Sequence, residues 1–317
     1  QVGAGYTLGT EALTYEPAEP LNLMDTLVNI FPSNAFQPLA DATMLQVIVI
    51  ALFFGFGIIA VGEKGVPAKN VVDSFAEVCF KIMSMILKLS PIGVFALICP
   101  VVAANGPSVL LPLLKVILVA YAAYVAHMVL TYSLAVKGFA GLSPLRFFRA
   151  MSEPMLFAFS SASSVGTLPF NMDATQQLGA RKEVSSFVLP LGATINMDGA
   201  AITITIMTLA AANTLGIQVS LPAAIVLSAM SALGACGASG VAGGSLLLIP
   251  MACSLFGISN DVAMQMVGVG FIIGVVQDSV ETALNSAGDV EFAATAEYHQ
   301  WRKQGKPLPE FLTGKKN

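Results

Sequence analysis

The chain has 317 residues, of which 56% are hydrophobic and only 11% are charged, and its formal net charge at neutral pH is −4. A soluble domain carries roughly 25% charged residues, so this composition excludes an ordinary water-soluble protein. The slightly acidic balance gives no reason to expect a nucleic-acid partner. The chain is therefore expected to have the lipid bilayer as its main partner.

Long apolar runs follow one another along the chain, and about 20 such residues suffice for a helix that crosses a bilayer. Strands of a membrane barrel would alternate apolar and polar residues, which these runs do not. Backbone groups in lipid must pair within their own segment, so the chain is predicted to be an all-α integral membrane protein. The runs are Met44 to Gly62, a weaker one ending at Ala104, Val116 to Val136, Phe187 to Gly216 and Val262 to Gln277.

Both ends of the chain are polar. Residues 1–21 resemble an external loop that follows a truncated N-terminus, since the chain begins with Gln1 and shows no signal peptide. The tail from Trp301 to Asn317 is rich in charge and is expected to be solvated. The four cysteines lie in apolar surroundings without metal-ligand spacing, so structural thiols are expected rather than a metal centre.

Two segments are too long for one span and carry small, flexible residues at their middle. Lys and Arg mark cytoplasmic loops, so Arg146 to Lys182 would enter from the cytoplasm and return there, while Gln218 to Asn260 would enter from outside. Non-helical backbone persists at membrane depth only where it lines a cavity. Two re-entrant hairpins of inverted orientation are predicted, an arrangement typical of transporters with a substrate site between the tips, although a channel can use re-entrant loops too.

The span that begins at Phe187 is interrupted by the sequence GATINMDG at residues 192–199. Asn and Gly at this depth predict local unwinding, which frees backbone carbonyl groups. Carbonyl, carboxylate, amide and hydroxyl oxygens are hard ligands, and no His or Cys cluster accompanies them. Sodium is the cation that we expect here.

The last span carries polar side chains on one helical face, because Asp278, Glu281, Thr282, Asn285 and Asp289 are three or four positions apart. An ionised carboxylate in a membrane helix costs at least ~2.5 kcal/mol, so these residues indicate function. The amide groups at the hairpin tips would attract an anionic group. A ligand whose amine binds Asp278 and whose carboxylate binds the hairpin tips would be an amino acid.

Four stretches together resemble the dicarboxylate/amino acid:cation symporter family, which includes the glutamate transporters. The resemblance runs from about residue 22 to 297 in matching order, and the family's first three spans have no counterpart in it. The stretches are SSASSVGTLPF (160–170), GATINMDGA (192–200), GACGASGVAGG (234–244) and DSVETALNSAGD (278–289).

The resemblance implies a glutamate-transporter-like bundle with unwound transmembrane helices, no organic cofactor and no enzymatic activity. It further implies a homotrimer in the bacterial inner membrane, with a cytoplasmic C-terminus and a transport domain that carries substrate by an elevator movement. The implied division is a scaffold at 22–107, a transport domain at 108–297 and a cytoplasmic tail at 298–317. The transport domain would comprise re-entrant hairpins at 144–180 and 219–257, the NMDG helix at 183–214 and the last helix at 261–297.

The family's functional residues carry over motif by motif. The implied substrate ligands are Ser163 and Ser164 at the first tip, Val241 and Gly243 at an extracellular gate, Asp278 for the amine, and Thr282 and Asn285 for the backbone groups. One implied sodium site uses carbonyls of Gly192, Asn196 and Asn285 with the Asp289 carboxylate. A second uses Thr194 with the backbone of Ala235, Cys236 and Ala238, and a third includes Asn196 and Asp198.

Two departures from the glutamate-transporter pattern bear on the substrate. Members that carry acidic substrates have an Arg where this chain has Glu281 and a Thr where it has Ala200. A Glu in a closed site would repel a side-chain carboxylate by several kcal/mol. It could accept a hydroxyl proton instead, which favours serine or threonine as the small neutral amino acid imported with sodium.

Other functions remain open from the residues alone. Proton coupling through Glu281 and transport of aspartate or glutamate are alternatives within the same family. An ion channel is a more remote alternative, because it also uses re-entrant loops and carboxylates. A membrane-embedded enzyme is less favoured, because the sequence holds no HExxH motif and no recognisable catalytic triad.

Overall fold

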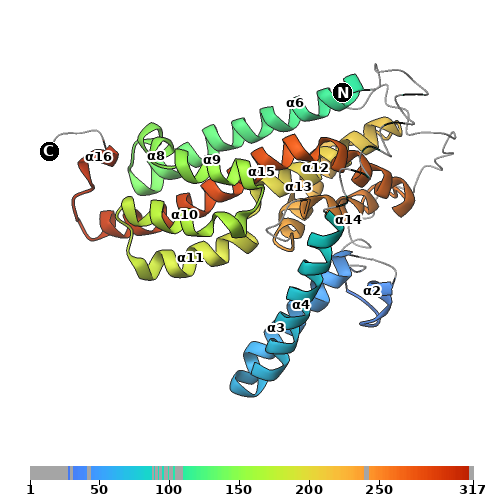
Figure 1. Cartoon of the computed structure of the whole chain (residues 1–317), viewed down its shortest axis with the longest axis horizontal. Coiled ribbons are helices and arrows are strands. Elements are labelled where there is room, and N and C mark those ends of the chain that lie inside the picture. Colours follow the sequence, from blue (N-terminus) through green and yellow to red (C-terminus); the bar gives the residue numbers. More distant parts are fainter. Residues whose placement is uncertain are drawn as a thin grey trace.

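The computed structural model describes residues 28, 31–40, 44–87, 89, 92, 95, 99, 103, 110–238 and 243–313. All secondary structure in these residues is helical (Figure 1), which confirms the predicted all-α class. The α-helices are α2 (Gln37–Ala40), α3 (Met44–Val61), α4 (Val66–Leu87), α6 (Leu110–His127), α7 (Ser133–Ala135), α8 (Pro144–Ala150), α9 (Ser152–Ser161), α10 (Ser164–Gln177), α11 (Lys182–Ile195), α12 (Asp198–Thr214), α13 (Leu221–Ala235), α14 (Ile249–Ser254), α15 (Asn260–Lys303) and α16 (Glu310–Thr313). Short 3-10 helices are η1 (Gly62–Gly65) and η5 (Ser245–Leu248), and short π-helices are η3 (Met128–Tyr132) and η4 (Val136–Ala140).

Three described stretches are long and apolar enough to cross a membrane: Val49–Cys79, Leu111–Ala140 and Lys182–Thr214. A fourth span results if the two parts of α15, Asn260–Gly274 and Val276–Lys303, count together, and these parts meet at 83°. All four overlap apolar runs predicted from the sequence. The chain is thus a multi-pass membrane protein.

Helices α3 and α4, joined by η1, form an arm that extends away from the other helices in Figure 1. Its apolar side chains are largely uncovered, and Phe53 and Phe56 are each 66% exposed. Apolar side chains exposed on this scale face lipid or another chain. The division between a scaffold at 22–107 and a transport domain at 108–297 remains a prediction.

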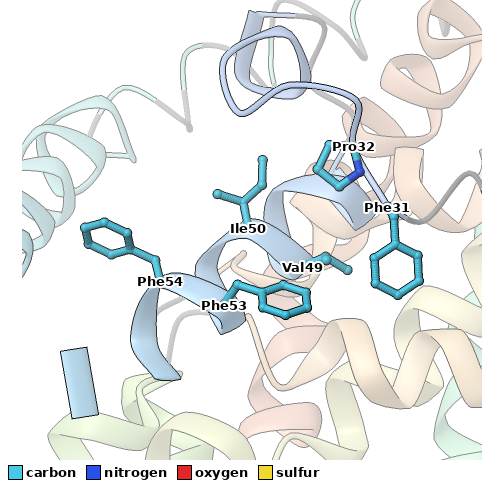
Figure 2. A pocket seen from close by; sticks show the side chains of 6 residues that line it. All are labelled: Phe31, Pro32, Val49, Ile50, Phe53 and Phe54. Carbon is cyan, nitrogen blue, oxygen red and sulfur yellow. The ribbon is translucent and has the colours of Figure 1, made fainter. Parts of the chain in front are cut away.

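An open pocket of about 470 Å³ lies beside the start of α3 (Figure 2). Its lining is apolar throughout, which is unsuited to a zwitterionic amino acid because the charged groups would lose their hydration without gaining partners. The amino-acid site that the sequence predicts is therefore expected elsewhere. The lining residues are Phe31, Pro32, Val49, Ile50, Phe53 and Phe54.

The 44-residue helix α15 is the centre of the bundle. It packs against α6, α9, α10, α11, α12 and α14, so most other elements meet along it. Small residues make this possible, since Ala287 and Ala293 are fully buried and let neighbouring helices approach closely. The last helix was predicted at 261–297, and the structure extends it to Lys303.

Breaks in the helices fall where the sequence predicts them. Between α9 and α10 the backbone of Ala162 is left-handed, with a φ of 47°, and the two helices pack on each other and on α15. Between α11 and α12 the residues Asn196 and Met197 leave helical geometry, as predicted for the NMDG motif. The hairpin α13–α14 turns within residues 236–244, of which 239–242 lie outside the described residues.

The expectation of a wholly solvated tail is wrong. Leu312 in α16 is 1% exposed, and its carbonyl accepts a hydrogen bond from the Ser143 amide at 2.9 Å. Arg146 donates to the carbonyls of Glu310 and Phe311 at 3.3 and 3.1 Å. The prediction rested on the charge of the tail and overlooked its few apolar residues, of which Leu312 packs against the start of α8.

Candidate functional site

The polar face of α15 is buried inside the bundle. Glu281, Asn285 and Asp289 are at most 4% exposed, Thr282 is 5% exposed, and Asp278 is half-buried. Burying carboxylates is costly unless hydrogen bonds or cations compensate them. The compensation differs between the two ends of this face.

At the Asp289 end, the carboxylate meets the break between α11 and α12. Asn196 Nδ2 donates to Asp289 Oδ1 at 3.1 Å and lies 3.4 Å from the Asn285 carbonyl oxygen. Asp289 Oδ2 is buried and has no hydrogen-bond partner. A Cβ atom on Gly192 would collide with Asp289 Oδ1, so the glycine makes room for the carboxylate. These oxygens suit a hard cation.

A second carboxylate, Asp198, begins α12 and faces α6 and its continuation. His127 Nε2 lies 3.0 Å from Asp198 Oδ2, and the Tyr132 hydroxyl donates to the same oxygen at 2.6 Å. The same hydroxyl oxygen lies 3.2 Å from the Leu284 carbonyl oxygen on α15. Asp198 Oδ1 is buried without a partner. Asp198, which belongs to the third predicted sodium site, therefore has one unpaired carboxylate oxygen. Its neighbours His127 and Tyr132 were not predicted to be part of that site.

At the other end of the face, Glu281 lies in a buried polar cluster. Its Oε2 atom accepts hydrogen bonds from the Thr203 hydroxyl, from Gln277 Nε2 at 2.5 Å and from Ser245 Oγ at 3.1 Å. Tyr124 on α6 extends the cluster, because its hydroxyl lies 2.6 Å from Thr203 Oγ1 and accepts from Gln277 at 2.7 Å. The cluster fixes the position of the carboxylate.

The NMDG motif packs directly on α15. The Gly199 amide donates to Asn285 Oδ1 at 2.8 Å, and Asn285 Nδ2 lies 3.4 Å from the Met197 sulfur. A Cβ atom on Gly199 would lie 2.7 Å from the Glu281 carbonyl oxygen, so only glycine fits. Ala200 follows it and is 1% exposed. Glu281 and Ala200 are the two positions at which the sequence departs from the glutamate-transporter pattern. Both lie in the buried interior.

The tip of the second hairpin makes a hydrogen bond to the polar face of α15. The Gly243 amide of the second hairpin donates to Asp278 Oδ2 at 3.0 Å, which joins two predicted substrate residues. In the first hairpin Ser163 caps α10 by accepting a bond from the Gly166 amide at 3.0 Å, and Ser164 is buried. The predicted gate residue Val241 lies outside the described residues.

The second predicted sodium site remains a prediction. Thr194 is exposed, and its hydroxyl donates to the Leu191 carbonyl of its own helix at 2.7 Å. Ala235 and Ala238 are buried near the end of α13, and Cys236 between them is exposed. Among the described residues, no cluster of three His, Cys, Asp or Glu side chains could hold a metal ion.

Several residues of the two clusters were missed from the sequence. Gln277 precedes Glu281 by four positions, and Thr203 follows Gly199 by four, so helical spacing was a usable signal for both. No helical spacing relates the carboxylates to the other members of the two clusters, which are Tyr124, His127, Tyr132 and Ser245. The missed residues are Tyr124, His127, Tyr132, Thr203, Ser245 and Gln277.

The chain is similar to known proteins over most of its length. Residues 3–298 match the model of the family described as Sodium:dicarboxylate symporter family. A protein of Bifidobacterium adolescentis named Serine/threonine transporter SstT is 49% identical over 297 residues, which cover 93% of this chain and 68% of the relative. A protein of the same name from Streptococcus thermophilus is 43% identical over 276 residues, which cover 85% of this chain and 67% of the relative. The chain thus spans about two thirds of the length of these relatives.

Proposed function

Because the chain belongs to the sodium:dicarboxylate symporter family, we propose that it is part of a sodium-coupled symporter that imports small neutral amino acids, chiefly serine and threonine. The relatives that share its sequence over most of its length are named serine/threonine transporters. The buried polar face of α15 supports this function, because it places carboxylates suited to a cation and to an amine on one helix.

Coupling to sodium is supported above all by the unpaired Asp289 Oδ2 atom. A buried carboxylate oxygen without a donor is costly, and a bound cation would remove that cost. The Asn285 carbonyl oxygen is a further oxygen near this carboxylate, since Asn196 Nδ2 approaches both of them. The Asp198 carboxylate offers a second unpaired oxygen and would bind a further ion.

Neutral substrates are favoured by Glu281. A substrate carboxylate about 4 Å from Glu281 would cost about 4 kcal/mol at an effective dielectric constant near 20, or about a thousandfold in affinity. Ala200 supplies no hydroxyl to hold such a carboxylate. A hydroxyl group would instead donate to Glu281, which selects serine and threonine over aspartate and glutamate.

In this proposal Asp278 binds the substrate ammonium group, and Thr282 and Asn285 bind its backbone groups. Amide groups at the tips of the hairpins α9–α10 and α13–α14 bind the substrate carboxylate. Sodium at Asp289 and substrate at Asp278 bind to the same helix, so each reduces the cost of burying the other's ligands. This shared helix provides the coupling.

The arrangement in the membrane is also a proposal. The hairpins at 144–180 and 219–257 would be re-entrant and inverted, and residues 108–297 would move as an elevator against a trimeric scaffold at 22–107. The left-handed break at Ala162 and the exposed apolar surface of the α3–α4 arm support it. The protein would lie in the bacterial inner membrane, with the tail at 298–317 in the cytoplasm.

Uptake by the full-length protein in liposomes tests the proposal. Labelled serine, threonine, alanine and aspartate are supplied with either sodium or choline outside, at fixed pH. We expect serine and threonine uptake that requires sodium and is not reduced by excess aspartate. Uptake that proceeds equally well in choline, or that prefers aspartate, would refute the function proposed here.

A further inference from the structure

The hairpin α13–α14 donates hydrogen bonds to both carboxylates that the proposed function assigns to the substrate. The Gly243 amide donates to Asp278 Oδ2 at 3.0 Å, and the Ser245 hydroxyl donates to Glu281 Oε2 at 3.1 Å. Asp278 and Glu281 lie three positions apart on α15, so the two donors bind one turn of helix. Ser245 is 3% exposed, and its contact is therefore part of the packed interior.

The two donors resemble the donors of the proposed substrate. Serine presents an ammonium N–H and a CH₂–OH group, and the hairpin presents the Gly243 N–H and the CH₂–OH of Ser245. In the proposed function the substrate ammonium group binds Asp278 and its hydroxyl binds Glu281. The hairpin thus occupies one oxygen of each carboxylate that the proposed function assigns to serine.

Glu281 Oε2 has no capacity left for another donor. A carboxylate offers about four acceptor positions over its two oxygens, and Oε2 already accepts from Thr203, Gln277 and Ser245. Thr203 is held within α12, and Gln277 lies four positions from Glu281 on α15 itself. Ser245 begins the short turn η5, directly after the loop of the hairpin. Ser245 is the donor that can withdraw with least disturbance.

We propose that Ser245 is a specificity-determining residue: its hydroxyl holds the position on Glu281 Oε2 that the hydroxyl of serine or threonine takes when the substrate binds. The inference rests on the function proposed above and extends it. In this proposal a hydroxylated substrate takes the Oε2 position from Ser245, whereas alanine leaves the Ser245 bond in place. Ser245 therefore lowers the preference for serine over alanine, because it keeps Glu281 paired when the substrate has no hydroxyl.

Replacing Ser245 by alanine tests the proposal in full-length protein reconstituted in liposomes. The ratio of kcat/KM for serine to that for alanine should rise roughly 2- to 10-fold, which is the equivalent of one hydrogen bond. Ser245→Cys keeps the shape with a weaker donor and should give an intermediate ratio. Ser231→Ala is the matched control, because this buried hydroxyl of α13 has no hydrogen-bond partner, and the ratio should not change. An unchanged or lower ratio in Ser245→Ala overturns the proposal.

Hydrogen–deuterium exchange without substrate separates this proposal from the proposed function. Ser245→Ala should speed exchange of the amides at 243–248 relative to wild type, and Ser231→Ala should not. If wild type shows no sodium-dependent uptake, the proposed function fails, and the exchange experiment still reports whether Ser245 secures the hairpin to Glu281. Equal exchange in wild type and Ser245→Ala shows that the contact is absent, and the specificity role falls with it.

Discussion

Asp289→Asn should abolish sodium binding at the Asp289 site while leaving the sodium-free fold intact. The substitution keeps the shape of the side chain, and the new amide oxygen can still accept the bond from Asn196 Nδ2. The amide NH₂ group then takes the place of the unpaired Oδ2 atom, where a cation would bind. A donor at this position repels the ion that the carboxylate attracts.

The expected loss follows from the charge removed. Two unit charges about 4 Å apart attract each other by about 4 kcal/mol at an effective dielectric constant near 20, which is about a thousandfold in affinity. At a sodium concentration of about 100 times Kd, binding stabilises the folded protein by about 2.7 kcal/mol. A thousandfold weaker Kd reduces this stabilisation to about 0.1 kcal/mol.

Thermal unfolding in sodium and in choline measures both quantities on purified protein, alongside serine uptake as a function of sodium concentration. We expect wild type to unfold at a higher temperature in sodium than in choline, and sodium to raise the unfolding temperature of Asp289→Asn less, because only the sites away from Asp289 remain. Asp261→Asn is the matched control, since Asp261 is an exposed acid at the start of the same helix. If Asp289→Asn still responds to sodium as wild type does, Asp289 does not bind the ion.

Three further substitutions test other parts of the structure. Glu281→Arg combined with Ala200→Thr should lower serine uptake at least tenfold and admit aspartate, as measured by labelled uptake, whereas unchanged selectivity would mean that Glu281 points away from the substrate. Gly199→Ala places a Cβ atom 2.7 Å from the Glu281 carbonyl oxygen and should destabilise the protein by roughly 1–3 kcal/mol; a thermal unfolding temperature equal to that of wild type would contradict this close approach. Leu312→Ala should cost roughly 2–3 kcal/mol and detach the tail, so that proteolysis cleaves it sooner, while equal protection would show that the tail is not docked.

The sequence predicted the features that depend on local spacing. Apolar runs located the spans, small residues located the breaks near Ala162 and Asn196, and positions three and four apart placed Asp278 to Asp289 on one buried face. Each of these follows from the period of a helix or from a residue's backbone preference. These predictions hold in the structure because the packing of other helices does not change the period of a helix or the backbone preference of a residue.

The partners of the carboxylates could not be predicted in the same way. Tyr132 and Asp198 are 66 positions apart in the chain, and Ser245 and Glu281 are 36 apart, so their contacts depend on how whole helices pack. No periodic pattern within one helix records such an approach. The docked tail was missed for a similar reason, because Leu312 becomes buried only against the start of α8.

The length of α15 connects the site to the thickness of the bilayer. At 1.5 Å per residue the segment 276–303 alone is about 42 Å long, whereas the hydrocarbon core of a bilayer measures about 30 Å. Part of this segment extends beyond the hydrocarbon core unless the helix is strongly tilted, and at its end Arg302 donates to the carbonyls of Gly138 and Phe139 at 2.7 and 2.8 Å. Liposomes with shorter or longer acyl chains should therefore change the rate of uptake.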